Sequence, residues 1–411
     1  MQRSAKSAPK RLAIAGAGVA LSIGGAGMAR ASDHFDSPAM TANPQADIGD
    51  IYAWTTPDGR RLNLAMTVVG HSFSDRLRYE FHIDSGKAFG RTTASTTITC
   101  RFPAPKVADC RVGQVDSVRG DATDPRGLEG RNHRFRLFAG LRDDPFYNNV
   151  KGSLAAYAAE AAAAKAGAPV DAGGCPHLAP AAVKEVMDQW RHTDGGPPVN
   201  LLANWTASAI VISLDLGVAA KGGKLLAVWG SVASGKRQLD HMARPFVGNT
   251  LLGVSPFSTD DASGAERERY NAVSPRAGSA YVRSIAKSLA MHDGLDGTCG
   301  DQLLAGKYPD PSTRYHALAR VFADDRLWVN SGSRVCAQFF AVELASLAGR
   351  KRYKADCGGR SPTYDTPNVW RSLLVDGTTD RVTDGLHGDE HTPSATAFPF
   401  LGAPDPHGVD H

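Results

Sequence analysis

The chain has 411 residues, of which 42% are hydrophobic and 21% are charged, and its formal charge at pH 7 is +4. Five basic residues and no acidic residue lie within residues 1–31, so the remainder has 41 basic and 42 acidic residues and a formal charge of about −1. This balance excludes a strong electrostatic attraction to nucleic acid or anionic membranes, and we expect neither as a partner.

Residues 1–31 have the pattern of a secretory signal peptide. Basic residues come first, the apolar run LAIAGAGVALSIGGAGM follows, and the small-residue pattern Ala29-Arg30-Ala31 ends the segment. We expect cleavage after Ala31. The apolar run is too short and too rich in glycine for a transmembrane helix, and no later stretch is long enough to cross a bilayer. We therefore expect a soluble mature protein that is periplasmic or secreted.

The next part of the chain is predicted to form β-strands. Short runs rich in β-branched and aromatic residues are separated by Gly, Asp and Pro clusters, as is typical of strands. In RYEFHI, the side chains of Tyr79, Phe81 and Ile83 share one face. The packing of two sheets is the natural way to bury such faces. The predicted strands are LNLAMTVVG (62–70), LRYEFHI (77–83), ASTTITCRF (94–102) and HRFRLFAG (133–140).

A helical insertion then interrupts the sheet, at about 153–200. It contains the alanine-rich SLAAYAAEAAAAKA (153–166) and AAVKEVMDQW (181–190). Strands return at ASAIVISLDLG (207–217) and KLLAVWGSV (224–232). The pattern from about 266 to 350 is mostly helical, and RVCAQFFAVELASLAG (334–349) is predicted to be a buried helix because its apolar residues cover most of the circumference. A tail rich in Gly, Asp and His covers 376–411. We therefore expect an α+β fold with a sandwich-like core, as one large domain over 32–411.

The cysteines favour disulfide bonds. The chain has six, none of them in a C-x-x-C pair, and an even number in an exported chain favours disulfides over zinc or redox chemistry. Cys100 and Cys110 bracket RFPAPKVAD between two strand-like runs, so we expect a disulfide across a hairpin. The spacing also suggests Cys336 with Cys357, which leaves Cys175 with Cys299, although six cysteines allow many other pairings.

The segment LHGDEHT near the C terminus contains the pattern H-x-x-E-H of some zinc peptidases, from His387 to His391. That chemistry needs both histidines on one face of a helix. Gly385, Gly388 and Pro393 break any helix at this point. We expect a solvated acidic loop with incidental metal affinity from its histidines.

Two other segments are candidate cation sites. HDGLDGTCGD (292–301) is rich in oxygen ligands but lacks the residue order of an EF-hand, which favours a turn tethered by a disulfide. LFAGLRDDPFYNN (137–149) places charged residues beside apolar ones, and Arg142 could pair with Asp143, with Asp144, or with Asp47 and Asp50. A buried salt-bridge corner is the favoured interpretation, ahead of a catalytic carboxylate pair. The sharper alternative is a divalent-cation site, such as a calcium site, formed by the four aspartates.

Several segments together resemble the bacterial domain-of-unknown-function 4331 family. They are SDHFDSPAM, NPQADIGDIYAWTTPDGRRLNLAMTV, FRLFAGLRDDPFY, LAVWGSVAS, QLDHMARPFVGNTLL, DRVTDGL and FPFLGAP. The resemblance runs in order from the mature start almost to the C terminus and implies an exported, β-rich protein with one copy of the domain, but no activity. It implies a plain Gly/Asp turn at His387 and His391. The positions that it marks are Asp33, His34, Asp36, Asp47, Asp50, Arg142, Asp143, Asp144, Arg244, Pro245 and Asn249.

Three functions remain open on the sequence. The first is a periplasmic or secreted binding protein for a metal ion, a small ligand or a protein. Cleavage after Ala31 would leave Ser32-Asp33-His34 at the terminus, where an amine, two amides and an imidazole form the square-planar site preferred by copper and nickel. The predicted metal ligands are Ser32, His34, Asp36, Asp47, Asp50, Asp143 and Asp144.

The second function is a hydrolase that uses the carboxylates of Asp47, Asp50, Asp143 and Asp144, with or without a metal. The mature chain has no G-x-S-x-G elbow, phosphate-binding loop or H-E-x-x-H motif to support a named enzyme class. The third is a structural or cell-surface module whose acidic corners stabilise a large sandwich.

Overall fold

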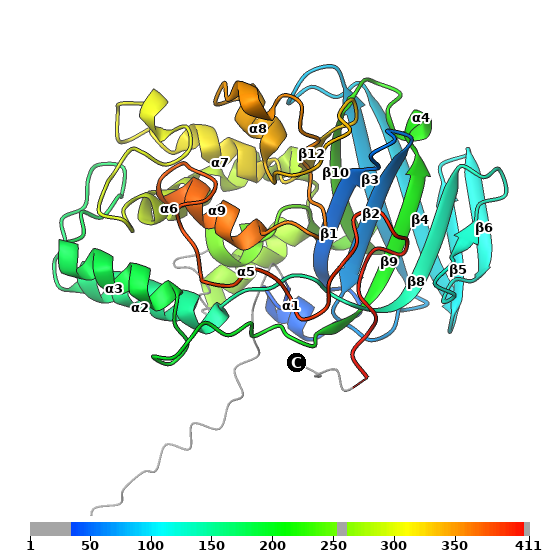
Figure 1. Cartoon of the computed structure of the whole chain (residues 1–411), viewed down its shortest axis with the longest axis horizontal. Coiled ribbons are helices and arrows are strands. Elements are labelled where there is room, and N and C mark those ends of the chain that lie inside the picture. The colour runs from blue at the N-terminus through cyan, green and yellow to red at the C-terminus, as the bar shows by residue number, and fades with distance from the viewer. Residues whose placement is uncertain (1–33, 253–260, 407–411) are drawn as a thin grey trace, which may run out of the picture.

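The computed structural model describes residues 34–252 and 261–406. The strands gather on one side of the molecule and most helices on the other (Figure 1). The predicted signal peptide, its cleavage site and Ser32 lie outside the described residues. Within the described ranges, no helix is both long and apolar enough to cross a membrane.

The first sheet has five antiparallel strands in the order β1-β2-β9-β8-β7. The strands are β1 (Ile48–Thr55), β2 (Arg61–Val68), β9 (Thr206–Asp215), β8 (Phe135–Asp143) and β7 (Leu128–Glu129). Every residue of β1 is buried, because both faces of this part of the sheet are covered. A strand with one solvent-exposed face shows alternating apolar and polar residues. This alternation is absent from β1, and the sequence did not predict this strand.

The second sheet has seven strands, in the order β11-β10-β3-β4-β5-β6 with β12 also paired to β10. The strands are β11 (Arg237–Met242), β10 (Leu225–Ser234), β3 (Leu77–Gly86), β4 (Ala94–Ala104), β5 (Val107–Val112), β6 (Asp116–Asp121) and β12 (Leu327–Asn330). Burial alternates along β4 and β5, so these strands have the pattern that the sequence predicts for one buried face.

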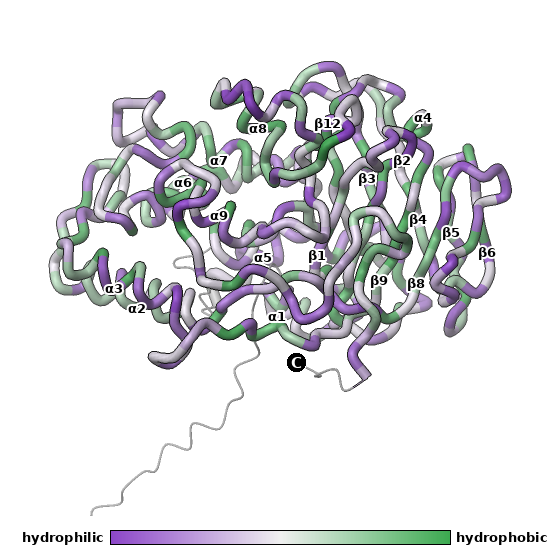
Figure 2. The backbone as a smooth tube through the Cα atoms, viewed as in Figure 1, coloured by the Kyte–Doolittle hydropathy of each residue, from purple (hydrophilic) through white to green (hydrophobic). Residues whose placement is uncertain are grey.

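The two sheets pack face to face. Gly230 of β10 lies against β1 and β2, where a Cβ atom would be 2.4 Å from Cδ1 of Ile51 and 2.7 Å from Cε of Met66. A side chain at this position would require Ile51 and Met66 to move. Apolar residues recur along the strands of both sheets (Figure 2), and those facing inward form one continuous core. The predicted α+β fold with a sandwich-like core is confirmed.

Helices cover one side of this sandwich. The insertion between β8 and β9 forms α2 (Val150–Lys165) and α3 (Pro180–Trp190), close to the predicted ranges. The later helices are α5 (Asp261–Asn271), α6 (Val282–Asp293), α7 (His316–Ala323), α8 (Ala341–Ser346) and α9 (Thr366–Val375). Shorter helical turns are α1 (Pro38–Thr41), α4 (Leu216–Ala219), η1 (Val247–Leu251), η2 (Pro275–Tyr281), η3 (Ala305–Lys307) and η4 (Lys351–Tyr353).

The prediction of one buried helix over 334–349 is wrong. Only α8 is helical in this range. Phe340 directly before it has a φ of 69°, a left-handed conformation that ends any helix. Upstream, the backbone N–H of Cys357 donates to the carbonyl of Val335 at 2.7 Å, and Cys336 forms a disulfide with Cys357. Tertiary pairing therefore overrides the apolar pattern.

The C-terminal segment covers the outer face of the first sheet. Trp54 of β1 packs against Phe400 with ring centroids 4.9 Å apart, and the indole N–H of Trp54 donates to the carbonyl of Ala395 at 2.8 Å. In Figure 1 this segment runs in red across the strands. The Gly- and Asp-rich tail is thus part of the folded domain as far as residue 406.

All three disulfides have the pairing that the spacing suggested. Cys100 and Cys110 face each other on β4 and β5. The other bonds join Cys175 to Cys299 and Cys336 to Cys357. Disulfides persist in oxidising compartments, so this content fits an extracellular protein.

Candidate metal centre

The predicted metal ligands do not form one site. Ser32 is outside the described residues, and the other six lie in three places with different partners. These are the N-terminal segment with His34, Asp36 and Asp47, the core of the first sheet with Asp50 and Asp144, and the end of β8 with Asp143.

In the N-terminal segment, His34 is buried and packs edge-on against Trp205, with ring centroids 4.1 Å apart. The side-chain amide of Asn249 donates to the carbonyl of His34 at 3.1 Å. Oδ2 of Asp47 accepts the N–H of Phe35 at 2.8 Å. These contacts hold the first described residues of the chain against the domain.

A cluster of buried carboxylates lies around this segment. Nδ2 of Asn271 donates to both carboxylate oxygens of Asp36, at 3.0 and 3.1 Å, and Oδ2 of Asp240 accepts the N–H of Ile48 at 2.8 Å. Burial raises the pKa of Asp240 well above its usual value, and the charges of Asp36 and Asp47 raise it further. Since amide groups already bind these oxygens, the group serves to hold the segment in place.

In the core of the first sheet, Arg360 is the cation that pairs with Asp50. The guanidinium of Arg360 also lies over the ring of Tyr52, at 4.3 Å. Tyr52 donates its hydroxyl to Oδ1 of Asp144 at 2.8 Å, and Thr67 donates to Oδ2 at 2.5 Å. A buried ion pair thus forms at Asp50, with Arg360 in place of the expected Arg142, whereas Asp144 is held by hydroxyl groups.

The proposed pairing of Arg142 was wrong. Its guanidinium lies 4.4 Å from the ring centroid of Phe138, and within the described ranges it forms no ion pair. The sequence missed Arg360 because its neighbours in the chain, GGRSPT, have no pattern that links them to β1.

At the end of β8, Asp143 meets two residues of the C-terminal segment. Its side chain is 1% exposed, and Oδ1 lies 3.4 Å from Nδ1 of His391. The same nitrogen is 3.8 Å from Oε1 of Glu390. One ligand atom from each of Asp143, Glu390 and His391 lies within 4.8 Å of the others. We call these three residues the Asp143 centre.

Close packing of the backbone forms this centre. The N–H of Asp143 donates to the carbonyl of Gly402 at 3.3 Å. A Cβ atom on Gly402 would lie 3.0 Å from Cβ of His391 and 3.2 Å from Oδ2 of Asp143. The backbone N–H of Asn204 donates to Glu390. Two widely separated parts of the chain are therefore brought together by main-chain contacts.

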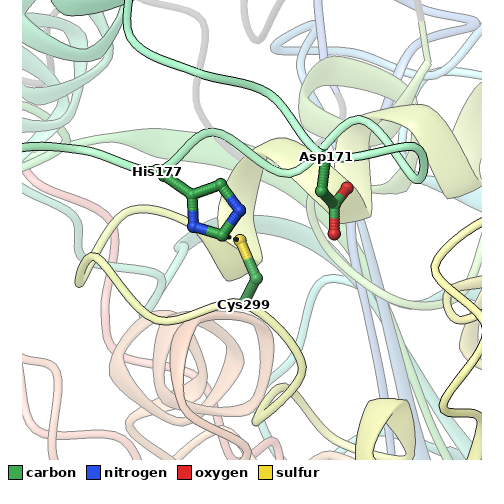
Figure 3. A group of neighbouring side chains, drawn as sticks. All are labelled: Asp171, His177 and Cys299. Carbon is green, nitrogen blue, oxygen red and sulfur yellow. Dashed lines mark hydrogen bonds between the residues drawn. The ribbon is translucent and has the colours of Figure 1, made fainter.

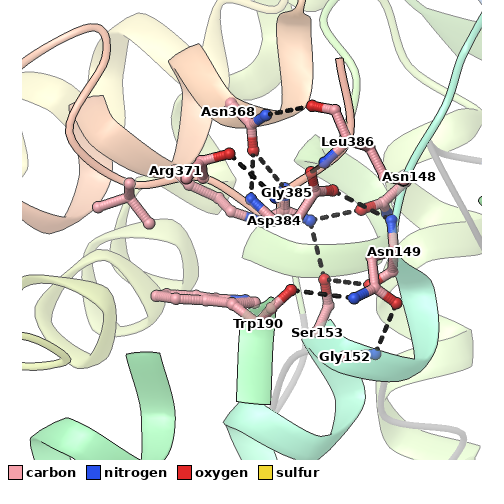
Figure 4. Close-up of polar contacts among 12 residues, drawn as sticks. Asn148, Asn149, Gly152, Ser153, Trp190, Asn368, Arg371, Asp384, Gly385 and Leu386 are labelled. Carbon is pink, nitrogen blue, oxygen red and sulfur yellow. Dashed lines mark hydrogen bonds and ion pairs between the residues drawn. The ribbon is translucent and has the colours of Figure 1, made fainter. Parts of the chain in front are cut away.

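A buried polar network anchors the segment that leads into the centre (Figure 4). Arg371 of α9 donates to Asp384 at 3.0 Å and to Ser153 of α2 at 2.8 Å. Asp384 also accepts the N–H of Asn149 at 3.0 Å. This network joins α9, α2 and the C-terminal segment just before residues 387–391.

A third acidic residue, Asp389, lies beside the centre. Oδ1 of Asp389 accepts a hydrogen bond from the side-chain amide of Asn200 at 2.8 Å. Burial and hydrogen bonding to Glu390 and Asp143 raise the pKa of Asp389 to about 10. Asp389 therefore keeps its proton at neutral pH and is the neighbour that can donate to the other two carboxylates.

The electrostatics of the centre follow from crowding and burial. Burial raises the pKa of Asp143 to about 6. A hydrogen bond from Asp389 opposes this effect, repulsion from Glu390 adds to it, and His391 opposes it more weakly. Burial also disfavours the charged form of Glu390, but hydrogen bonds from Asp389 and Asn204 outweigh it and lower the pKa of Glu390. Among the described residues, the ion pairs of Asp143 and Glu390 are with His391 alone. The centre therefore has more anionic than cationic groups.

The zinc-peptidase geometry is absent from this loop. Residues 387–391 are not helical and His387 is exposed, as expected from Gly385, Gly388 and Pro393. The structure nevertheless brings His391 and Glu390 to a buried aspartate. Glu390 and His391 belong to the segment LHGDEHT and Asp143 to LFAGLRDDPFYNN, and no local signal joins β8 to a loop near the C terminus.

The possible calcium loop at 292–301 is a tethered turn. Both oxygens of Asp293 accept backbone N–H groups, from Gly300 at 2.5 Å and from Gln302 at 2.8 Å. Tyr315 donates its hydroxyl to the same carboxylate at 2.6 Å. Cys299 ties this turn to Cys175. The carboxylate thus has protein donors in place of a cation.

Comparisons with protein-family models, curated proteins and solved structures found no match for this chain.

Proposed function

We propose that this protein is a metal-binding protein, with a divalent first-row ion such as zinc held by Asp143, Glu390 and His391. The observation that supports it is the state of Asp143. Its carboxylate is buried, no N–H group of the described residues donates to either oxygen, and the neighbour that can donate to it is the protonated carboxyl group of Asp389. Burying a carboxylate with so few partners is costly. A bound cation would compensate for this cost.

The mixed ligand set argues for the type of metal. Calcium prefers oxygen ligands alone, whereas an imidazole with two carboxylates suits zinc and its neighbours in the first transition row. We therefore propose such an ion in place of the calcium that we expected at the aspartates. His391 is the residue that changes the expectation, because sequence reasoning did not include it in the aspartate group.

The position of the centre suggests a structural consequence. Asp143 ends a central β-strand, while Glu390 and His391 belong to the segment that covers the outer face of the same sheet. A bound ion would link this segment to the sheet. Binding to the folded state alone raises its stability by about 2.7 kcal/mol when the free metal is at a hundred times the dissociation constant.

The leader and the three disulfides support an exported protein, and we propose that it is periplasmic or secreted. The resemblance to the domain-of-unknown-function 4331 family remains a proposal. Copper or nickel binding at Ser32-Asp33-His34 is a separate proposal that depends on cleavage after Ala31, and sequencing of the mature N terminus tests it.

A hydrolase is the second candidate function, and it depends on the same centre. Three protein ligands leave a coordination position for water, as in catalytic zinc sites, and the His391 side chain is 36% exposed. A metal-bound water there would be open to substrate. A screen of ester and phosphoester substrates, with and without zinc, tests this candidate, and a true activity must be lost in Asp143→Asn.

The test of the metal proposal is zinc titration by calorimetry of the dialysed protein with its disulfides intact. We expect one zinc ion per chain, and a loss of affinity of about tenfold or more in Asp143→Asn and in His391→Ala. His387→Ala is the matched control, since His387 is an exposed histidine of the same loop. Unchanged binding by Asp143→Asn, or equal loss in the control, would refute the proposal.

A further inference from the structure

A second group of metal-ligand residues surrounds the disulfide between Cys175 and Cys299. Ligand atoms of Asp171, His177 and Cys299 lie within 4.8 Å of one another. Figure 3 shows the His177 ring directed at the sulfur of Cys299, with Nδ1 3.8 Å from Sγ. Cys175 is bonded to that sulfur. Two sulfurs, an imidazole and a carboxylate therefore meet at one point.

In the oxidised protein the two sulfurs are bonded to each other. Zinc binds cysteine as the thiolate, so this disulfide state has no strong zinc site. Reduction would release two thiols beside His177. Cys299 is partly exposed, so a small reductant can reach it. Cys100 and Cys110 are fully buried by contrast.

The loop that carries Asp171, Cys175 and His177 has contacts that do not depend on the disulfide. The N–H of His177 donates to the carbonyl of Pro169 at 2.8 Å, and the N–H of Asp171 donates to the carbonyl of Cys175 at 3.0 Å. Arg314 binds Oδ2 of Asp171 at 2.9 Å with both side chains largely buried. The loop therefore keeps its shape when the sulfur bond is broken.

The turn that carries Cys299 is also held independently. Both oxygens of Asp293 bind backbone N–H groups of this turn, and Gln302 donates to the carbonyls of Leu289 and Leu374 at 2.8 and 2.6 Å. The turn and the loop are in close contact, since a Cβ atom on Gly294 would lie 2.3 Å from the carbonyl oxygen of Pro176. The two cysteines thus remain neighbours after reduction.

We propose that reduction of the Cys175–Cys299 disulfide creates a zinc site formed by both thiolates and His177, with Asp171 beside it. A dithiol reductant transfers two electrons and two protons, so that it becomes a cyclic disulfide while the protein gains two thiols. Zinc then displaces the two thiol protons and binds both sulfurs. Exchange with an added disulfide, which accepts two electrons and two protons to become two thiols, would re-form the Cys175–Cys299 bond and release the ion. The site is therefore gated by redox state.

The geometry suits tetrahedral zinc. Zinc–sulfur bonds of about 2.3 Å place two thiolates about 3.8 Å apart in a tetrahedral site. The Cα atoms of Cys175 and Cys299 are 6.1 Å apart, so rotation of the side chains separates the sulfurs without backbone movement. His177 is already next to one sulfur and supplies the third ligand. The Asp171 oxygens are bound by Arg314 and by the N–H groups of Gly173 and Cys175, so water takes the fourth position.

Cobalt binding to protein in the Asp143→Asn background tests this proposal without contribution from the Asp143 centre. The protein is reduced with dithiothreitol, freed of it under nitrogen, and titrated with cobalt, whose charge-transfer absorption reports thiolate ligands. We expect one tightly bound cobalt per reduced chain, displaced by zinc, and no such absorption before reduction. His177→Ala should weaken binding by about tenfold or more, while the exposed His192→Ala should not.

Two cysteine variants identify the sulfurs. Cys175→Ser with Cys299→Ser should abolish the cobalt absorption, and Cys336→Ser with Cys357→Ser should retain it. His177→Ala preserves every disulfide, so its near-ultraviolet circular dichroism shows that the fold is intact. Unchanged cobalt absorption in the Cys175/Cys299 variant, unchanged affinity in His177→Ala, or loss of the folded spectrum on reduction of this disulfide would each overturn the proposal.

Discussion

Replacement of Arg360 by methionine should be among the most destabilising single changes in this chain. Arg360 is 1% exposed and pairs with Asp50, which is also 1% exposed. Methionine fills most of the volume, so the chief loss is electrostatic. Two unit charges about 4 Å apart interact by about 4 kcal/mol at an effective dielectric constant of about 20. Breaking a buried pair from one side costs about 3–5 kcal/mol, because the remaining charge loses its ion-pair partner.

This cost concerns the carboxylate of Asp50, which loses its ion pair with Arg360. Asp144 lies in the same cluster but accepts hydroxyl groups from Tyr52 and Thr67 on its two oxygens, so it retains partners when Arg360 is lost. We therefore expect Arg360→Met to lower the free energy of unfolding by about 4 kcal/mol. Asp50→Asn should lower the free energy of unfolding by less, because Arg360 still has the nearby carboxylate of Asp144 as a charged neighbour.

Urea denaturation at pH 7 of the wild type, both single variants and the double variant measures the coupling. The double variant removes both charges, so its loss should be smaller than the sum of the single losses by about 2 kcal/mol. Arg334→Met is the control, since Arg334 is exposed, and it should change the stability by less than about 0.5 kcal/mol. A loss below about 1 kcal/mol for Arg360→Met, or additive single losses, would refute the argument.

Three further measurements test other parts of the structure. Burial lowers the pKa of His292 to about 4, so the folded state resists its protonation. The resulting stability is present above the unfolded pKa of about 6.5 and is lost as the pH falls toward 4. Between pH 7 and pH 5 this loss is about 2 kcal/mol, and urea denaturation of His292→Gln should show a correspondingly weaker pH dependence than the wild type. Gly230→Ala should lower the free energy of unfolding by about 1–3 kcal/mol because the new methyl group overlaps Ile51, and a neutral effect in urea denaturation would contradict the packing of the sheets. Zinc should raise the melting temperature of the oxidised wild type in calorimetric scans but not that of Asp143→Asn, and an equal rise in both would place the ion elsewhere.

Much of the fold follows from local pattern. The alternation of RYEFHI predicted β3, and the alanine-rich run predicted α2, because period and propensity act over a few residues. Cys100 and Cys110 were paired correctly because a hairpin brings the strands on both sides of a short loop together. The same local reasoning failed for 334–349, where a disulfide and a left-handed Phe340 break an apolar run that a helix would suit.

The candidate sites were harder to predict. Asp143 and Asp144 are adjacent in sequence and appeared to form one acidic pair, but Asp144 contacts Tyr52 and Thr67, whereas Asp143 faces His391. Successive residues near a strand end project to different sides, so a shared motif does not mean a shared site. Arg360, the partner of Asp50, is equally distant in the chain and has no motif of its own.

The sequence by itself determined the leader pattern, the class of fold and the residue types that the sites use. Only the tertiary structure decided which of these residues meet. Strand order and the path of the C-terminal segment bring Glu390 and His391 to Asp143, and two loops held by independent hydrogen bonds bring His177 to Cys299. Contacts of this kind depend on packing between distant segments, and nothing in the local chemistry of either segment specifies its partner.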